Sequence, residues 1–320
     1  MLLSVAIMDV HIIKRAFFMM KIFAPQYYKH FKCIADKCKN NCCVDWEIDI
    51  DDATYKKYLG IGTEYGKQII ESIDVSGDFR CFRLNEGRCP HLNDAGLCEI
   101  ISEYGDSMLS DICREHPRFY NNLGTHIEAG LGMVCEEAAR LILTDESNGL
   151  EEIGVSDEAP ADLIFDNSQY IARMYDILSE NVPLEKRIRN LEEEFLIPMN
   201  MHSFGEWVLL FGELEILSSE WQDLMDKTEY KETTDALDIY FERFIKYMIY
   251  RHVSVSESYD NLRARLGFIL VSELMVRQMI FSSSDMSLEG VINVMRLFSA
   301  EIEYSEDNTN ALIFEFESAV

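Results

Sequence analysis

Cysteine is the residue type whose spacing points most directly to chemistry in this chain of 320 residues. Nine cysteines occur, and none lies beyond position 135. Four of them fall in one short stretch: Cys33, Cys38, Cys42 and Cys43. The others are Cys81, Cys89, Cys98, Cys113 and Cys135. Scattered structural cysteines would not stop at a boundary, so the clustering indicates a shared role. Three explanations fit it: a disulfide framework, a metal or iron–sulfur site, and a redox-active thiol pair.

A metal centre is the explanation that the spacing favours. Thiolates bind zinc in closed tetrahedral sets and hold iron–sulfur clusters, usually through four cysteines. The pattern C-x4-C-x3-C brings three thiols close enough along the chain to converge. The adjacent Cys42 and Cys43 would point apart unless the backbone turns sharply, so one of them can serve a second role. Further ligands must come from the later cysteines, with His91 and His116 as substitutes. The predicted metal ligands are Cys33, Cys38, Cys42, Cys43, Cys89, Cys98, Cys113 and Cys135.

The identity of the metal stays open at this point, because zinc and an iron–sulfur cluster of the 4Fe-4S type both suit thiolate ligands. For Cys81 and Cys135 a role as small buried side chains is equally compatible with the sequence. A redox relay is disfavoured because no C-x-x-C pair occurs. The C-x3-C-x2-C spacing of radical methyl-donor chemistry is also absent.

The N-terminus bears on the disulfide alternative. Residues 1–20 lack a signal peptide's order of basic, apolar and small residues, and Asp9 and Lys14 interrupt their apolar runs. The sequence therefore predicts a cytoplasmic protein, in a reducing compartment that disfavours disulfides. A second start-like stretch begins at Met20, so residues 1–19 are expected to be a disordered extension or a mis-assigned start.

Composition restricts the partners. Hydrophobic residues make up 48% and charged residues 27%, as in a folded protein, and the net charge is −28. Nucleic acid is not expected as a partner because phosphate binding needs a basic surface. Most of the negative charge lies beyond residue 140, where a cationic partner such as a lysine side chain would be attracted.

The fold class predicted is mainly α: an irregular cysteine-rich metal-binding domain with short strands, followed by a helical domain. Residues 20–143 are expected to form the first domain, with a short helix at 49–58, a strand at 79–84 and a helix starting at 135. Residues 144–162 are acidic and contain two glycines and a proline, which predicts a linker. Residues 163–320 are expected to be helical.

Apolar periodicity defines this second domain. Side chains from Trp207 to Leu224 recur at intervals of three and four residues, and the same pattern returns at 237–248 and 291–298. Residues 262–281 are apolar nearly all round, which predicts a central helix covered by neighbours.

These motifs resemble the flagellin lysine-N-methylases and, within them, the zinc- or iron-chelating cysteine-cluster family. The specific part of the resemblance is the cysteine portion, Cys33-x4-Cys38-x3-Cys42-Cys43-x2-Trp46, Cys89-Pro90, Cys98-Glu99-Ile100 and Asp111-Ile112-Cys113-Arg114-x-His116-Pro117-Arg118. The longer match adds Pro25-Gln26-Tyr27-Tyr28, Phe82-Arg83-Leu84-Asn85, 135–141 and 301–308. One departure is Glu136, where the family has proline after the cysteine.

The resemblance implies methyl transfer from S-adenosylmethionine to lysine side chains of flagellin, with the cysteines holding an iron–sulfur or zinc centre. No membrane partner is expected, because the apolar runs of residues 1–20 and 262–281 are too short to span a bilayer. The residues support the chemistry in part. A lysine amine, with an ordinary pKa near ~10.4, must lose its proton before it attacks a sulfonium methyl, and acidic or tyrosyl groups can accept it. Candidate pocket residues that flank the cysteines are Tyr27, Tyr28, Asp45 and Trp46.

Catalytic residues cannot be assigned from the sequence. Gly130-x-Gly132 precedes a helix, but the third glycine of a dinucleotide-type loop is missing, so the match is weak. Two other functions stay open: a non-catalytic zinc- or iron-chelating module, and an interaction protein whose cysteine centre only fastens its N-terminal loops.

Overall fold

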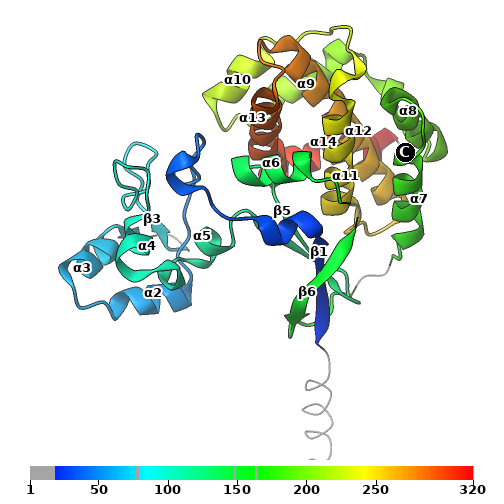
Figure 1. Cartoon of the computed structure of the whole chain (residues 1–320). Coiled ribbons are helices and arrows are strands. Elements are labelled where there is room, and N and C mark those ends of the chain that lie inside the picture. The colour runs from blue at the N-terminus through cyan, green and yellow to red at the C-terminus, as the bar shows by residue number, and fades with distance from the viewer. Residues whose placement is uncertain (1–18, 77–78, 148, 163–164, 320) are drawn as a thin grey trace, which may run out of the picture. The chain divides into compact units, whose positions relative to one another are not determined.

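The computed structural model describes residues 19–76, 79–147, 149–162 and 165–319. These residues are mainly helical with a few short strands, which confirms the predicted fold class (Figure 1). They divide into two compact units. Unit 1 contains 19–30, 120–134 and 138–319, and unit 2 contains 31–119 and 135–137. Of the predicted extension, only Met19 is among the described residues.

Unit 1 holds most of the helices. They are α6 (Glu136–Thr144, from Ala138 onward), α7 (Ser168–Leu178), α8 (Leu184–Glu194), α9 (Phe204–Glu213), α10 (Ser219–Met225), α11 (Asp238–Met248), α12 (Tyr259–Ser282), α13 (Leu288–Phe298) and α14 (Glu306–Ala319). Its shorter elements are η1 (Gln26–His30), η4 (Met199–Met201), η5 (Asp235–Leu237) and the π-helical segments η6 (Ile249–Val253) and η7 (Ser299–Glu303).

The predicted central helix is α12. It packs against α11, α13 and α14 (Figure 1). Its side chains are buried on nearly every side. Two of its charged residues are paired in this core, since Arg277 lies 2.6 Å from Glu273 on the same helix and 3.0 Å from Asp238 of α11. Pairing lowers the cost of placing charge in this core.

The apolar stripe from Trp207 to Leu224 belongs to two helices, α9 and α10. Trp207 and Trp221 are buried as expected, but Leu217 between the helices is 50% exposed. Ser218 starts α10 by accepting a hydrogen bond from the Trp221 amide at 3.2 Å. A serine N-cap of this kind begins a new helix. The spacing of the apolar residues continues across this break, so periodicity did not reveal it.

Four strands form a sheet: β1 (Met20–Pro25), β4 (Arg118–Asn122, in unit 1 from Tyr120 onward), β5 (Ile127–Leu131) and β6 (Leu150–Ser156). Their order is β4-β5-β1-β6, with β1 parallel to β5 and antiparallel to β6. The register places Phe23 opposite Glu128. This sheet joins the segment before the cysteines to segments that follow them.

The sheet makes the unit bounds differ from the expected domains. Residues 20–30 and 120–134 belong to unit 1, whereas the sequence placed them in the cysteine-rich domain. The expected linker, 144–162, contains strand β6. Pairing between strands distant in sequence sets these bounds, and local composition carries little information about such pairing.

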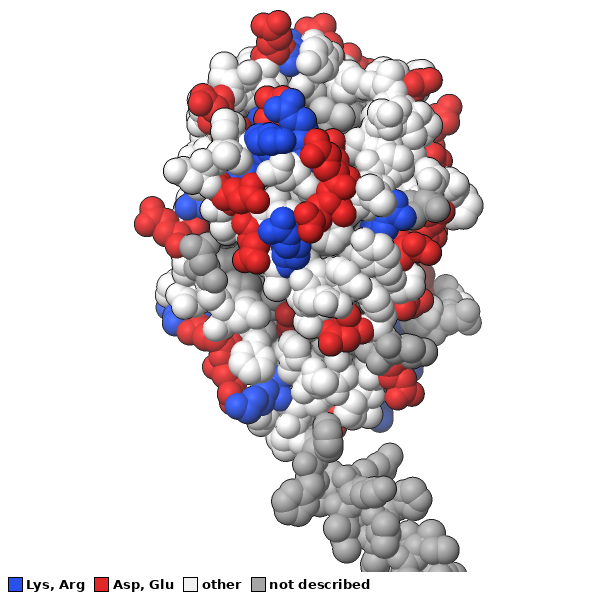
Figure 2. Space-filling view, turned by 90° about the vertical axis from the view of Figure 1, so that its right-hand side faces the viewer, with Lys and Arg blue, Asp and Glu red and all other residues white. Residues whose placement is uncertain are grey.

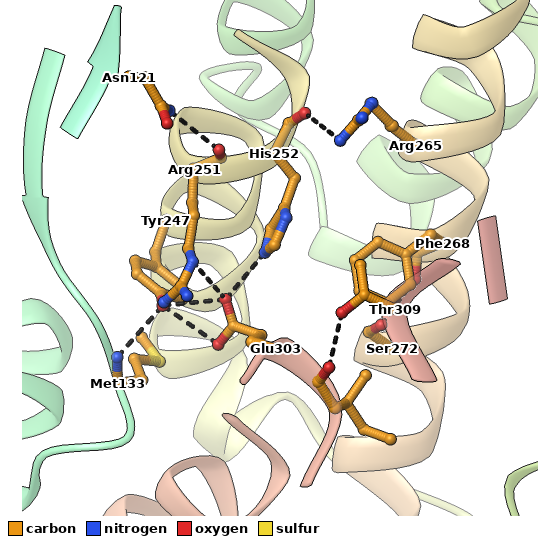
Figure 3. Close-up of polar contacts among 11 residues, drawn as sticks. Asn121, Met133, Tyr247, Arg251, His252, Arg265, Phe268, Ser272, Glu303 and Thr309 are labelled. Atoms are coloured by element: carbon orange, nitrogen blue, oxygen red, sulfur yellow. Dashed lines mark hydrogen bonds and ion pairs between the residues drawn. The ribbon is translucent and has the colours of Figure 1, made fainter. Parts of the chain in front are cut away.

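Two π-helical segments meet in a buried polar network in unit 1 (Figure 3). Glu303 of η7 is fully buried and lies 2.9 Å from His252 Nε2 and 3.4 Å from Arg251 Nε, both of η6. The carbonyl of Arg251 accepts a hydrogen bond from Asn121, and that of His252 accepts one from Arg265. Side chains thus satisfy backbone groups that the wider helical turn leaves without their usual partners.

Unit 2 is built from short elements: η2 (Ala35–Lys37), α2 (Asp52–Leu59), α3 (Glu64–Glu71), β2 (Ile73–Asp74), β3 (Cys81–Phe82), α4 (Glu99–Tyr104), η3 (Asp106–Met108) and α5 (Asp111–Glu115). The predicted short helix is α2, which Asp51 caps by accepting from the Thr54 amide at 2.8 Å. The predicted strand shortens to β3. The unit has its own apolar core, with Ile48, Tyr58 and Phe82 buried.

Charged side chains of both signs are interspersed on the face shown in Figure 2, where small basic groups are bordered by acidic ones. Exposed ion pairs such as Arg173–Glu194, which joins α7 to α8, are of this kind. This face lacks the continuous basic patch that phosphate binding needs. Within the described ranges, no helix is both long enough and apolar enough to cross a bilayer.

Candidate functional site

Backbone pairing in unit 2 brings Cys43 beside Cys89. The Cys89 amide donates to the Cys43 carbonyl at 2.9 Å, and the Asp45 amide donates to the Gly87 carbonyl at 2.6 Å. Gly87 has a φ of +78°, and a Cβ there would lie 2.0 Å from Asp45 Oδ1, so the approach requires glycine. Asp45 itself has a φ of +54°, so the chain turns sharply soon after the Cys42-Cys43 pair.

Two further thiols come from the helices that follow. Cys98 is the N-cap residue of α4, and the next amide, of Glu99, donates to the His91 carbonyl at 2.8 Å. Cys113 lies within α5. Both side chains pack against the apolar core of unit 2 and are only half-buried. The core therefore positions cysteines from separate parts of the sequence around one region.

The charges of five thiols influence one another: Cys42, Cys43, Cys89, Cys98 and Cys113. The pKa of Cys89 and of Cys113 is raised to about 11, mainly by burial and in smaller part by the charges of neighbouring thiols. A hydrogen bond between Cys42 and Cys43 lowers the pKa of the first thiol and raises that of the second. A bound cation would reverse the upward shifts because it attracts thiolates.

The remaining predicted ligands, Cys33, Cys38 and Cys135, also belong to unit 2. Burial raises the pKa of Cys38 to about 11, with smaller contributions from the charges of Glu136, Cys42 and Cys33. Glu136, the first residue of α6, accepts a hydrogen bond from the Lys39 amide at 2.9 Å and lies 3.8 Å from the Cys38 sulfur. Cys135 precedes it, so the predicted helix start is confirmed.

The donor types in unit 2 fit a thiolate-ligated metal, and all nine cysteines are free thiols. The arrangement is not a closed site. Across the described residues, no set of three or more His, Cys, Asp and Glu side chains is grouped as a metal ion requires. The thiols are therefore close enough to affect one another's pKa values, but their sulfur atoms do not converge on one metal position. The metal and its ligand set stay predictions.

Two residues considered as ligands or thiol partners have other roles. His91, a possible substitute ligand, is buried between Tyr65 at 3.1 Å from Nδ1 and Ser72 at 2.9 Å from Nε2, so both ring nitrogens have partners. Cys81 is surrounded by acids, and after burial the charge of Glu47 is the largest cause that raises its pKa. Cys81 is therefore set apart from the other thiols.

The four candidate pocket residues fall in different units. Tyr27 and Tyr28 belong to η1 of unit 1, whereas Asp45 and Trp46 belong to unit 2. Tyr27 is buried, and the Tyr28 hydroxyl lies 3.2 Å from that of Tyr120. Trp46 packs against the apolar core of unit 2 and edge-on to His116. These four residues remain candidates for the pocket, and Tyr27 and Tyr28 are considered together because both lie on η1.

A carboxylate that the sequence did not single out lies near Tyr250, a residue that also interacts with Tyr27 and Tyr28. Glu128 is on β5, and its side chain is 12% exposed. Burial raises its pKa from 4.5 to about 7, which the Ser254 hydroxyl partly opposes. Its charge raises the pKa of Tyr250, as do those of Tyr27 and Tyr28, although burial is the larger cause. The sequence feature that could have identified Glu128 is that it is the one acidic residue in the otherwise apolar stretch IEAGL.

Unit 2 also has a surface groove of about 500 Å³, whose lining is partly apolar and partly charged: Ile50, Val75, Phe79 and Ile112 with Asp49, Asp51, Asp52, Asp111 and Arg80. Its carboxylates serve the fold. Asp51 caps α2 and accepts from the Asp111 amide at 3.0 Å, and Asp52 pairs with Arg80. The groove therefore does not by itself indicate a ligand.

Curated proteins similar to this chain share a stretch of 128 residues, 38% of its length. A protein named lysine-N-methylase from Salmonella choleraesuis is 30% identical, and one from Salmonella typhimurium is 29% identical. The stretch covers 32% of each, so the match spans about a third of the length of these relatives. No family model and no solved structure matches.

A shorter relative is covered more fully. The flagellar biosynthetic protein FliU from Salmonella muenchen is 30% identical over 128 residues, which is 76% of its length. Identity at this level over three quarters of a relative, together with two lysine-N-methylases over the same length, shows common descent. The chain belongs to the flagellin lysine-N-methylase family.

Proposed function

We propose that this protein transfers methyl groups from S-adenosylmethionine to lysine side chains of flagellin. Family membership is the observation that carries the proposal, because the matched relatives are named for lysine N-methylation and for flagellar biosynthesis. The acidic surface is compatible with a substrate that presents lysines, since the net charge is −28. The protein would act in the cytoplasm, where its thiols stay reduced.

The proposed metal centre lies in unit 2. The charges of Cys42, Cys89, Cys98 and Cys113 influence one another, and these thiols come from separate segments of the chain. A zinc ion or an iron–sulfur cluster there would fasten those segments together. The other proposed ligands, which would complete the set or serve a second centre, are Cys33, Cys38, Cys43 and Cys135.

The reaction itself needs positioning and a proton acceptor. S-adenosylmethionine supplies an electrophilic methyl group, and the attacking lysine must be neutral and aligned with it. Since lysine is protonated at neutral pH, the protein must remove that proton and keep water away from the amine. Tyrosyl and carboxyl side chains of unit 1 are the groups that we propose for this task.

Purified protein, prepared anaerobically with its metal, is incubated with flagellin and methyl-labelled S-adenosylmethionine. We expect label on flagellin lysines, identified by peptide mass mapping. Flagellin with acetylated lysines is the matched control and should stay unlabelled. Absence of label on folded, unmodified flagellin, with the metal content intact, would contradict the proposed activity.

A non-catalytic chelating module is the second candidate. Unit 2 has its own apolar core around the thiols, which is what an independent metal-binding module requires. The labelling experiment separates the two functions, because a chelating module would take up metal and transfer no methyl group.

A further inference from the structure

Glu128 is the carboxylate of unit 1 that is hardest to explain as part of the fold. Its Oε2 is buried and, within the described residues, has no hydrogen-bond partner. Its other oxygen lies 3.8 Å from His126 Nε2, beyond hydrogen-bond distance. An acid that only served packing would be paired or replaced by an apolar residue, since an unsatisfied buried oxygen costs free energy.

Two tyrosine hydroxyl groups near this carboxylate donate elsewhere. Tyr250 of η6 donates to the Ala129 carbonyl at 3.0 Å, and Tyr175 of α7 donates to the Lys246 carbonyl at 3.2 Å. The Ser254 hydroxyl lies 3.1 Å from the Tyr250 carbonyl and also hydrogen-bonds to Glu128, which partly opposes the rise in the pKa of that carboxyl group. Each of these residues is near enough to interact electrostatically with Glu128. Several hydroxyl groups therefore lie near the carboxylate, but none of them donates a hydrogen bond to Oε2.

The remaining neighbours make the site aromatic. On β1, Phe23 is the register partner of Glu128 and packs edge-on to His126. Tyr27 and Tyr28 of η1 lie close enough to Tyr250 for their charges to raise its pKa, after burial and Glu128. His126 is the one ring here that can carry a positive charge, and burial lowers its pKa. A carboxylate among aromatic rings, with an oxygen left over, suits an ammonium group.

We propose that Glu128 holds the amine of the substrate lysine and accepts its proton, with Tyr175 and Tyr250 beside it and with Tyr27 and Tyr28 near Tyr250. The inference rests on the proposed function and names the site at which the lysine reacts. The proposed site combines Tyr27 and Tyr28, which were candidates from the sequence, with Glu128, which was not a candidate from the sequence.

The proton balance is simple. The lysine ammonium gives one proton to the Glu128 carboxylate, which leaves a neutral amine and a neutral carboxyl group. The amine lone pair then forms the N–CH3 bond as the S–CH3 bond of the sulfonium donor breaks, and the sulfur keeps that electron pair. Glu128 later releases its proton to water. A carboxyl group with a pKa raised to about 7 is suited to both transfers near neutral pH.

Glu128→Gln removes the proton acceptor and keeps the size of the side chain. We expect kcat/KM for methyl transfer to flagellin to fall about 100-fold or more, the usual effect of losing a general base. The activity of the wild type should rise with pH through about 7, and the residual activity of the variant should not. Glu152→Gln, which alters an exposed acid of β6, is the matched control and should change neither quantity.

Unchanged kcat/KM and an unchanged pH profile in folded Glu128→Gln would overturn the inference. A second measurement does not depend on activity: binding of a flagellin peptide with one lysine is compared with the same peptide carrying norleucine. The wild type should prefer lysine, and Glu128→Gln should lose that preference. Equal preference in both proteins would overturn the proposal. A wild-type protein that transfers no methyl refutes the proposed function, and the peptide comparison then decides the role of Glu128 in holding the amine.

Discussion

Tyr247 donates to Glu303 with its hydroxyl placed between the two carboxylate oxygens, at 3.0 and 3.1 Å (Figure 3). The same hydroxyl accepts hydrogen bonds from the Met133 amide at 3.1 Å and from Arg251 Nη1 at 2.8 Å. One phenol therefore links α11, both π-helical segments and the chain that follows β5. The acidic side chain of this network, Glu303, is fully buried.

Replacing Glu303 by glutamine is expected to destabilise unit 1 strongly. The change leaves the buried guanidinium of Arg251 without its counter-charge, and removing one member of a buried ion pair costs about 3–5 kcal/mol. Urea unfolding followed by circular dichroism measures the loss. Glu213→Gln, at an exposed position at the end of α9, should stay within about 0.5 kcal/mol of the wild type. Equal midpoints for the two variants would contradict the assigned role.

Gly132→Ala probes the same region from the backbone side. An added Cβ would lie 2.2 Å from Tyr304 Oη and 3.0 Å from Arg251 Nη1, so the two side chains must move. We expect a loss of about 1–3 kcal/mol, the usual cost of overpacking. Gly205→Ala is the control, because it has open space on helix α9 and should stabilise the protein by up to about 1 kcal/mol. Thermal melts of both variants test the contrast.

Serine at Cys42 is expected to lower the metal content and to unfold unit 2, because metal binding and folding are one equilibrium. Metal analysis and an absorbance spectrum on anaerobically prepared protein measure the first effect. A brown protein would identify an iron–sulfur cluster, and a colourless protein with bound zinc would identify a structural zinc site. Cys81→Ser, beside Glu47 rather than the other thiols, should keep its metal. Wild-type metal content in Cys42→Ser would remove Cys42 from the ligand set.

The stability of the protein should depend on Glu128 through pH. Burial raises its pKa from 4.5 to about 7 in the folded protein, so between these values the folded state holds a proton that the unfolded chain has released. Stability therefore falls as pH rises through this window, by about 3 kcal/mol at most, since one pKa unit is worth about 1.4 kcal/mol. Neighbouring Tyr175 and Tyr250 stay neutral here, because burial raises their pKa values.

Urea unfolding of the wild type and of Glu128→Gln at about pH 5 and about pH 8 checks this sign. The wild type should lose more stability between the two conditions than the variant. His126 works in the opposite direction because burial lowers its pKa, but it is present in both proteins and cancels in the difference. Identical pH dependence in the two proteins would show that the folded state does not hold the Glu128 proton.

Local sequence patterns predicted the helices well and the sheet poorly. The central helix α12 was recognisable because its residues are apolar on nearly all sides, and the start of α6 was recognisable from acidic residues after Cys135. Strand β6 was hidden in an acidic stretch, where its pairing with β1 depends on residues far away in the chain. Parallel pairing of β1 with β5 has the same long-range origin.

The candidate site shows the same division. Spacing identified the thiols, and the structure places Cys89, Cys98 and Cys113 about one apolar core, which supports a shared role without closing a metal site. The spacing along the sequence did not predict that Tyr27 and Asp45 belong to different units, because residues close in sequence can lie in different units. Glu128 was missed since its interest comes from burial, and burial depends on the sheet.

The order of the four strands has a consequence for how such a protein can change over evolutionary time. Unit 2 leaves the sheet after β1 and its main segment rejoins at β4, and only β5 separates these two strands. Unit 2 is therefore inserted within the sequence of unit 1, and the chain enters and leaves it at nearby strands. The chain returns to unit 2 once more, in the short segment 135–137. Loops around the cysteines can lengthen or shorten without shifting the register of the sheet, so related proteins can vary their thiol-bearing insert while they keep the host scaffold.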